Sequence, residues 1–130
     1  MGLLDKARLP KGEDMGLDMM LKNSRDETVA TWRKANQIRG WLVRHEIIQN
    51  DDDCVERIIT KKQIEELVND CKKVLENHDL AKELLPTTEG FFFGSQEYDE
   101  WYFKDLQNTV ELLSPLLEQT DENYIYHDWW

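Results

Sequence analysis

The sequence predicts an α+β domain in which about three helices pack on a small antiparallel sheet of short strands. Apolar residues recur at helical spacing in three segments, and short β-branched or aromatic segments lie between and beyond them. A chain of 130 residues with 40% hydrophobic residues can also bury one core without disulfides or metals. We expect residues 1–14, with Pro10 and Gly12, to be a flexible arm and residues 15–130 to be one compact domain.

In the first half of the domain, we expect one strand and one helix. Residues 17–21 are a short apolar run and fit a strand, although periodicity alone does not separate strand from helix there. Residues 22–28 are polar, and we expect them to form a loop. A helix then begins at a cap, either Thr28 or Thr31, and runs to about Glu46. Its apolar face consists of Trp32, Ala35, Ile38, Leu42 and His45.

The middle of the chain predicts a turn, a strand and the clearest helix. Residues 50–53 read as a turn and residues 54–59 as a short β-branched strand. Thr60 and Gln63 have the spacing of a capping box, in which each residue bonds the backbone of the other. The helix that follows has one apolar stripe, which consists of Ile64, Leu67, Val68, Cys71, Val74 and Leu75.

The last third predicts two further helices and a final strand. Asp79 is expected to cap a short helix that Pro86 ends, and Ser95 to cap a long helix that Pro115 kinks rather than ends. The long helix has an apolar face of Tyr98, Tyr102, Leu106, Thr109, Leu113, Leu116 and Leu117. Residues 124–130 have the alternation of a strand.

The charge of the chain is large and uneven. The net charge of −11 argues against direct binding of nucleic acid, which needs a basic surface. Residues 29–46 nevertheless carry a net +3, whereas residues 47–130 carry −13. We find no signal peptide and no apolar run long enough to span a membrane, so we expect a cytoplasmic protein whose two cysteines are free thiols.

The basic segment is the strongest candidate site. On the predicted helix Arg33, Asn36 and Gln37 share one polar face, and Lys34 and Arg39 add positive charge beside it. Guanidinium and amide groups suit a carboxylate, a phosphate or the edge of a base, so this face could bind a small anionic ligand. The alternative is a basic helix face that neutralises the acidic helices next to it.

Aromatic residues supply a second candidate feature. Residues 91–93 are three consecutive Phe between two glycines, and Phe92 could stack a ligand's base together with Trp32 or Trp101. Burial of these Phe rings in the core is the alternative. A phosphate cradle at this loop is rejected, because Glu97, Asp99 and Glu100 follow in the helix's first turn and would repel an anion.

Signals for metals, cofactors and catalysis are weak. Residues 51–53 are consecutive Asp but lack the spacing of a calcium loop, and the two cysteines have no zinc-ligand spacing. No nucleophile, P-loop or dinucleotide motif occurs, so nothing argues for an enzyme and no cofactor is expected. Trp129 and Trp130 either pack on the core or form a sticky surface, which would mark a partner or a homo-oligomer interface.

Several motifs together resemble those of small phage and prophage proteins. The shared segments are Met-Gly-Leu-Asp-Met-Met-Leu at 15–21, Trp-Arg-Lys-Ala-Asn-Gln-Ile at 32–38, Leu-Leu-Pro at 84–86, Gly-Phe-Phe-Phe-Gly at 90–94 and Tyr-Asp-Glu-Trp-Tyr at 98–102. These phage proteins typically begin Met-Gly-Leu-Asp-Met-Tyr-Leu, so Met20 and the 14-residue extension are departures. The resemblance implies a phage context and carries over no catalytic or binding residue.

Two functional hypotheses follow. In the first, the chain is a phage-encoded, non-enzymatic binding protein that sequesters a small anionic ligand, such as a nucleotide used as a host defence signal. Its ligand site would contain Trp32, Arg33, Lys34, Asn36, Gln37, Arg39, Phe92 and Trp101. In the second, it is an acidic interaction module that inhibits a basic host protein.

Overall fold

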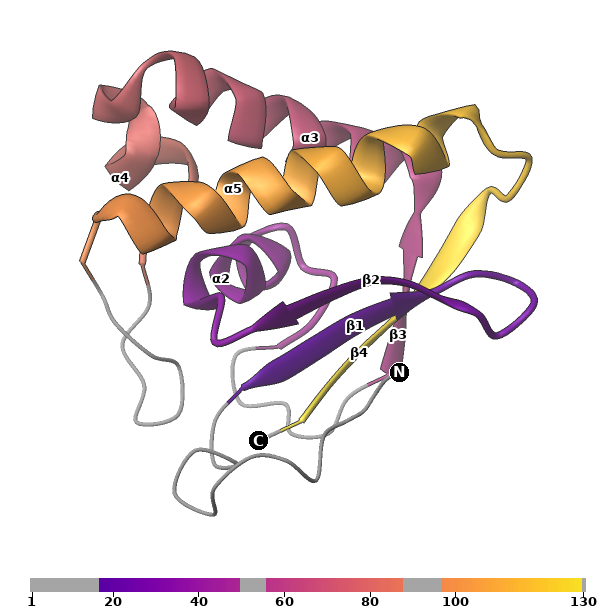
Figure 1. Ribbon diagram of the computed structural model, residues 1–130. Coiled ribbons are helices and arrows are strands. Elements are labelled where there is room, and N and C mark those ends of the chain that lie inside the picture. The colour runs from indigo at the N-terminus through magenta and orange to yellow at the C-terminus, as the bar shows by residue number, and fades with distance from the viewer. Residues whose placement is uncertain (1–16, 50–55, 88–96, 130) are drawn as a thin grey trace.

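The computed structural model describes residues 17–49, 56–87 and 97–129, and it confirms the α+β fold (Figure 1). In the described residues four strands form one sheet in the order β2-β1-β4-β3, and every neighbouring pair is antiparallel. The strands are β1 (Asp18–Lys22), β2 (Thr28–Arg33), β3 (Glu56–Thr60) and β4 (Asn123–Trp129).

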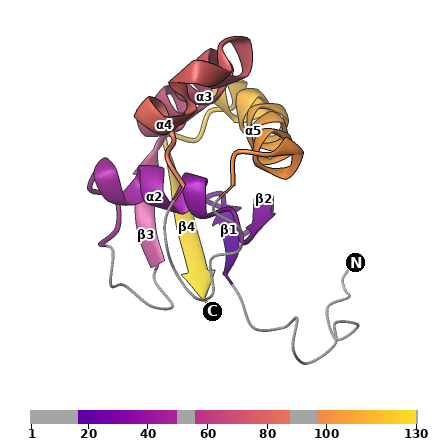
Figure 2. The same cartoon turned by 90° about the vertical axis from the view of Figure 1, so that its left-hand side faces the viewer.

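The helices of the described residues lie on one side of this sheet (Figure 2). Helices α3 and α5 run side by side, and α2 lies between them and the sheet. The α-helices are α2 (Asn36–Arg44), α3 (Lys61–Glu76), α4 (Ala81–Leu84) and α5 (Glu100–Leu113). Two 3₁₀ helices, η2 (His78–Leu80) and η3 (Ser114–Glu118), precede α4 and follow α5.

The core forms where the sheet meets these helices. Successive side chains of a strand point to opposite faces, so alternate residues are buried. Met19 and Leu21 of β1 and Tyr124 and Tyr126 of β4 are at most 2% exposed. The residues between them, such as Met20, are only half-buried. The sheet therefore has one face that the helices bury and a second face whose side chains, such as Met20, are less buried.

The predicted strands at residues 17–21 and 124–130 are present as β1 and β4, and the predicted capping box is confirmed. Thr60 Oγ1 accepts the N–H of Gln63 at 3.2 Å, and the Gln63 side chain accepts the N–H of Thr60 at 2.8 Å. The apolar stripe of α3 is buried as expected, except that Leu75 is only partly buried.

The prediction of a helix that begins at Thr28 or Thr31 is wrong for the first part of that segment. Residues 28–33 form strand β2, and α2 begins only at Asn36. Three of these six residues are β-branched and one is Trp32, a composition that suits a half-buried strand. Pairing with β1 settles the matter, because Met19 lies opposite Trp32 and Leu21 opposite Ala30. The helical spacing of Trp32, Ala35 and Ile38 is therefore accidental, because Trp32 lies on β2 and only Ile38 lies on α2.

Three predicted helix ends are also corrected. Helix α5 begins at Glu100, and its cap is Asp99, whose Oδ1 accepts the N–H groups of Trp101 and Tyr102 at 3.1 Å. Asn77 rather than Asp79 caps the short helix after α3. Helix α5 ends at Leu113, and Pro115 lies in a 3₁₀ helix instead of a kinked α-helix.

Several predictions concern residues outside the described ranges. These are the arm at residues 1–14, the turn at 50–53, Cys54, the Phe-rich loop at 90–94 including Phe92, Ser95 and Trp130. Within the described ranges, no helix has the length and apolar character needed to cross a bilayer.

Candidate functional site

The residues predicted to bind a ligand do not share one exposed helix face. Trp32 lies on β2, is 8% exposed, and donates its indole N–H to Thr109 Oγ1 of α5 at 2.8 Å. Arg33 lies on the same strand but points to the other face of the sheet, where Nη1 contacts Asp18 Oδ1 of β1 at 2.8 Å. Its Nη2 is buried without a hydrogen-bond partner among the described residues. Each side chain thus ties β2 to a different neighbour.

Lys34 forms the junction between strand β2 and helix α2. Its backbone has a φ of 56°, in the left-handed region that is unfavourable for a residue with a Cβ. Its N–H donates to the carbonyl of Leu17 at 2.6 Å, and its carbonyl accepts the N–H of Asn36 at 3.0 Å. This sharp bend turns the chain from the edge of the sheet onto its covered face, where α2 begins.

Asn36, Gln37 and Arg39 are buried beneath the other helices, each at most 2% exposed. Gln37 Nε2 donates to the carbonyl of Tyr102 at 3.2 Å and lies 3.4 Å from Asp105 Oδ2, so it joins α2 to α5. Polar groups buried to this extent are normally hydrogen-bonded, and those of Gln37 are bonded within the chain. The contacts of Gln37 accordingly position α2.

Arg39 belongs to a polar cluster between α2 and β4. Its Nε lies 2.8 Å from Asp128 Oδ2, and that oxygen also accepts the phenol of Tyr126 at 2.7 Å. Burial, and next the nearby Asp128 carboxylate, raise the pKa of the Tyr126 phenol well above its usual range, so the phenol stays protonated and donates. Asp128 Oδ1 is buried without a hydrogen-bond partner among the described residues.

Asp105 is a partly buried carboxylate of α5 that faces α2. Burial raises its pKa from 3.8 to about 6, the hydrogen bond from Gln37 opposes this, and the charge of Asp99 adds to it. Altered carboxylates can mark catalytic sites. Here, however, the Asp105 carboxylate accepts from Gln37 of α2, and the Asp105 carbonyl accepts from the Thr109 hydroxyl, so its contacts are structural ones.

Trp101 stands apart from these buried residues. It lies in the first turn of α5, is 65% exposed, and has the Lys104 ammonium 5.0 Å from its ring centre. Leu112 is 37% exposed and lies eleven residues later, about three helical turns, so it shares the same side of α5. We call this side the outward face of α5; its exposed residues are Trp101, Lys104, Asn108, Glu111 and Leu112.

The outward face belongs to the most acidic part of the chain. Residues 97–129 carry nine acidic side chains and one lysine, a net charge of −8. Glu100, Glu111 and Glu118 on α5 and η3 are exposed to solvent. Helix α3, packed alongside α5, carries equal numbers of acidic and basic residues. Acidic side chains therefore outnumber basic ones along α5 and the segment that follows it, although Asp128 is buried against Arg39 and Lys104 lies beside Trp101.

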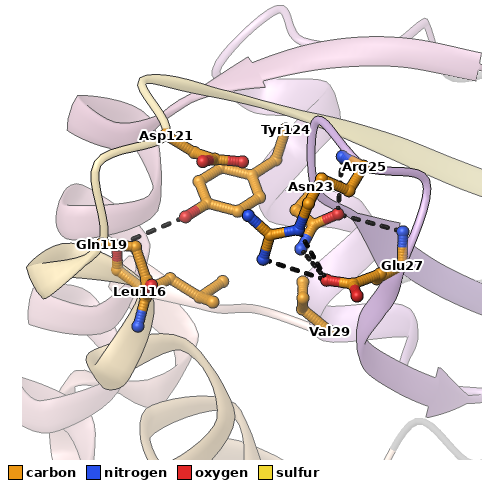
Figure 3. A pocket seen from close by; sticks show the side chains of 8 residues that line it. All are labelled: Asn23, Arg25, Glu27, Val29, Leu116, Gln119, Asp121 and Tyr124. Atoms are coloured by element: carbon orange, nitrogen blue, oxygen red, sulfur yellow. Dashed lines mark hydrogen bonds and ion pairs between the residues drawn. The ribbon is translucent and has the colours of Figure 1, made fainter.

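A cavity of about 210 Å³ lies beyond the C-terminal end of α5 (Figure 3). It is bounded by the β1–β2 loop on one side and by η3 and the loop to β4 on the other. Eight of the described residues line it, namely Asn23, Arg25, Glu27, Val29, Leu116, Gln119, Asp121 and Tyr124. None of the described residues that were predicted to bind a ligand lines this cavity.

The two loops around the cavity are held by polar contacts. Asn23 Oδ1 accepts the N–H groups of Arg25 and Glu27, which shapes the β1–β2 loop. The N–H and hydroxyl of Ser24 both donate to Asp121 Oδ2, at 3.0 and 2.9 Å. This contact joins segments 97 residues apart and fixes the width of the cavity mouth.

Comparison with known proteins finds no family model, no curated protein and no solved structure that matches this chain. Within the described residues, no group of three or more His, Cys, Asp or Glu side chains could hold a metal ion. Any functional assignment therefore depends on the geometry just described.

Little of this geometry could be predicted from the sequence. Among the described candidate residues Trp101 is the exposed one, and its predicted role in stacking a ligand's base stays a prediction. Asp105, Asp128 and the cavity residues were not singled out, because their partners lie far away in the chain.

Proposed function

We propose that this protein is a non-enzymatic interaction module whose outward α5 face binds a basic surface of another protein. The observation that carries the proposal is Trp101, a tryptophan 65% exposed within a segment of net charge −8. Tryptophan is enriched at protein interfaces because its large ring buries much apolar surface on contact while its N–H can still find a partner. Asp99 fixes the start of this helix, so the ring is presented from a defined backbone.

Tryptophan and surrounding charge have different roles in such a contact. Tryptophan is among the residues that most often dominate interface energies, and a desolvated tryptophan can contribute 2 kcal/mol or more, an order-of-magnitude value. Exposed carboxylates mainly raise the association rate and select a partner of opposite charge. The outward face supplies Trp101 as the anchor and Glu111 as one acidic group, and the exposed Glu100 and Glu118 of α5 and η3 extend the acidic rim beyond it.

The structure offers less support for sequestration of a small anion by the basic segment. Such a site needs Arg33, Asn36, Gln37 and Arg39 to converge on one space. Arg33 and Arg39 instead project to opposite faces of the sheet, and each is paired with an aspartate. These pairs also cancel the positive charge that would attract an anion.

The resemblance to phage proteins gives the proposal a biological setting. A host protein with a basic surface, for example one that binds nucleic acid, is the first class of partner to test, and the proposed activity is inhibition by covering that surface. An acidic protein can compete with phosphates for such a surface because it presents the same sign of charge.

The proposal is tested with two pairs of variants that remove equal charge from different helices. The first variant carries Glu100→Gln and Glu111→Gln on α5, and the control carries Glu65→Gln and Glu66→Gln on α3. All four side chains are exposed. Partners are captured from host lysate, identified and purified. The affinity of each variant for the partner is then measured by calorimetry at salt concentrations from about 50 to about 300 mM, over which salt screens exposed charges increasingly.

We expect the α5 variant and Trp101→Ala to weaken binding, by about tenfold or more for Trp101→Ala, whereas the α3 control binds like the original chain. Affinity should also fall as salt rises. Equal effects of the α5 and α3 variants, or an unchanged affinity of Trp101→Ala, would refute the proposed face. Tight binding of a nucleotide in the same assays would favour the sequestration hypothesis instead.

A further inference from the structure

We propose that the cavity beyond α5 binds the side chain of one arginine or lysine of the partner. This inference rests on the proposed function, because a basic surface supplies such side chains, and it adds a second, specific point of contact. The cavity lies next to η3, which continues directly from α5, so one partner could cover Trp101 and enter the cavity. Helix α5 has 14 residues and is about 21 Å long, a span within one ordinary interface.

The floor of the cavity suits the alkyl part of such a side chain. Val29, Leu116 and the ring of Tyr124 supply apolar surface. Tyr124 is held in place by its hydroxyl, which donates to the carbonyl of Leu116 at 3.3 Å. Arginine and lysine bury their methylene groups against apolar surface while the charged end stays at a polar rim. A compact anion would gain nothing from this floor.

The rim of the cavity suits the charged end. Glu27 and Asp121 lie on opposite sides of it, one from each loop (Figure 3). Glu27 uses Oε1 to accept from Asn23 and Arg25, and Asp121 uses Oδ2 to accept from Ser24. Among the described residues, no hydrogen bond involves the second oxygen of either carboxylate. These two oxygens are available to a cation.

Both carboxylates stay charged at neutral pH. The hydrogen bonds from Asn23 and then Arg25 lower the pKa of Glu27, and those from Ser24 lower the pKa of Asp121. Lys61 and Arg25 lie near this rim and reduce its negative field, and Arg25 is one of the residues that line the cavity. Its side chain is 68% exposed and contacts only one oxygen of Glu27, at 3.1 and 3.2 Å. This contact also shows that a guanidinium can reach the Glu27 carboxylate.

The test uses short peptides and NMR spectra of the isotope-labelled full chain. The probe is acetyl-Gly-Arg-Gly-amide, and its control has citrulline in place of arginine, which keeps the shape and removes the charge. We expect the arginine peptide to shift the amide signals of Ser24, Gln119 and Tyr124, while the indole signal of Trp101 stays in place. Shifts of equal size with the citrulline peptide would overturn the inference.

Variants test the two rim carboxylates. Glu27→Gln and Asp121→Asn each keep a hydrogen-bond acceptor for the loop contacts but lose the charge. We expect each substitution to lower the affinity for the arginine peptide by about tenfold. Glu111→Gln removes the same charge from the outward face of α5 and should change the affinity by less than about twofold, because exposed charges act weakly at a distance. Unchanged binding to both rim variants, with native-like spectra, would refute the site.

The two proposals can fail separately. If the purified partner depends on Trp101 but is indifferent to Glu27→Gln and Asp121→Asn, the cavity inference is wrong and the interaction module stands. If the arginine peptide binds the cavity but Trp101→Ala leaves partner binding unchanged, the proposed role of the outward face of α5 is wrong and the cavity site stands.

Discussion

Arg39 and Asp128 form a buried ion pair in which Nε and Oδ2 are 2.8 Å apart, and their side chains are 2% and 0% exposed. The pair joins α2 to β4 across 89 positions of the chain. Tyr126 donates to the same oxygen of Asp128, which makes the cluster a three-residue network. A residue that looked like part of a basic surface is thus a core residue of the fold.

The first prediction concerns this pair. Asp128→Ala should lower the free energy of unfolding by about 3–5 kcal/mol, because it leaves the buried Arg39 without its counter-charge. Urea denaturation followed by circular dichroism measures this loss.

The matched control replaces both charges, as Arg39→Met with Asp128→Leu. We expect the double variant to recover much of the lost stability, since buried pairs can often be exchanged for apolar residues of similar size. A single Asp128→Ala variant that unfolds at the same urea concentration as the original chain would contradict the structure.

The second prediction concerns pH and Asp105. Its pKa in the folded protein is about 6 and its ordinary value is 3.8, so the folded state binds the proton more tightly than the unfolded state. The original chain should therefore lose stability as pH rises from about 4 to about 6, because the carboxylate becomes charged where it is partly buried.

Asp105→Asn removes this titration while keeping an acceptor for Gln37. The variant should be the more stable of the two at pH 7, and the difference should shrink toward pH 4. Melting temperatures of both chains over this range measure the difference. A gap in melting temperature that is constant with pH would show that Asp105 does not titrate as described.

The third prediction concerns the start of α3. Thr60→Ala removes the oxygen that accepts the N–H of Gln63 and should cost about 1 kcal/mol of stability. Thr60→Ser keeps the oxygen and should cost less than half as much. Equal losses for both substitutions would show that the methyl group, and not the cap, stabilises this helix start.

The fourth prediction compares two tryptophans. Trp101→Ala should change the free energy of unfolding by less than about 0.5 kcal/mol, because an exposed side chain has few contacts to lose. Trp32→Ala should cost about 3–5 kcal/mol, because it empties a buried space and leaves Thr109 without the indole donor. A large loss of stability in Trp101→Ala would mean that this ring packs on the chain and is not a contact surface.

Local patterns predicted the parts of the fold that depend on nearby residues. The capping box at Thr60, the stripe of α3 and the alternation of β4 all follow from residues within a few positions of one another. Such signals were enough for the α+β class. They also singled out Trp101, although the sequence offered no measure of its exposure.

Only the tertiary structure decided whether the segment around Trp32 and Arg33 is a helix or a strand. Its apolar residues fit both a helix and a strand, and pairing with β1 selected the strand. The same arrangement assigned a buried carboxylate to Arg39 and joined Ser24 to Asp121 beside the cavity. The sequence by itself determined which segments could form helices and strands. The pairing of distant residues determined which charged side chains were buried and which stayed at the surface, because a buried charge is stable only beside a partner that the local sequence does not reveal.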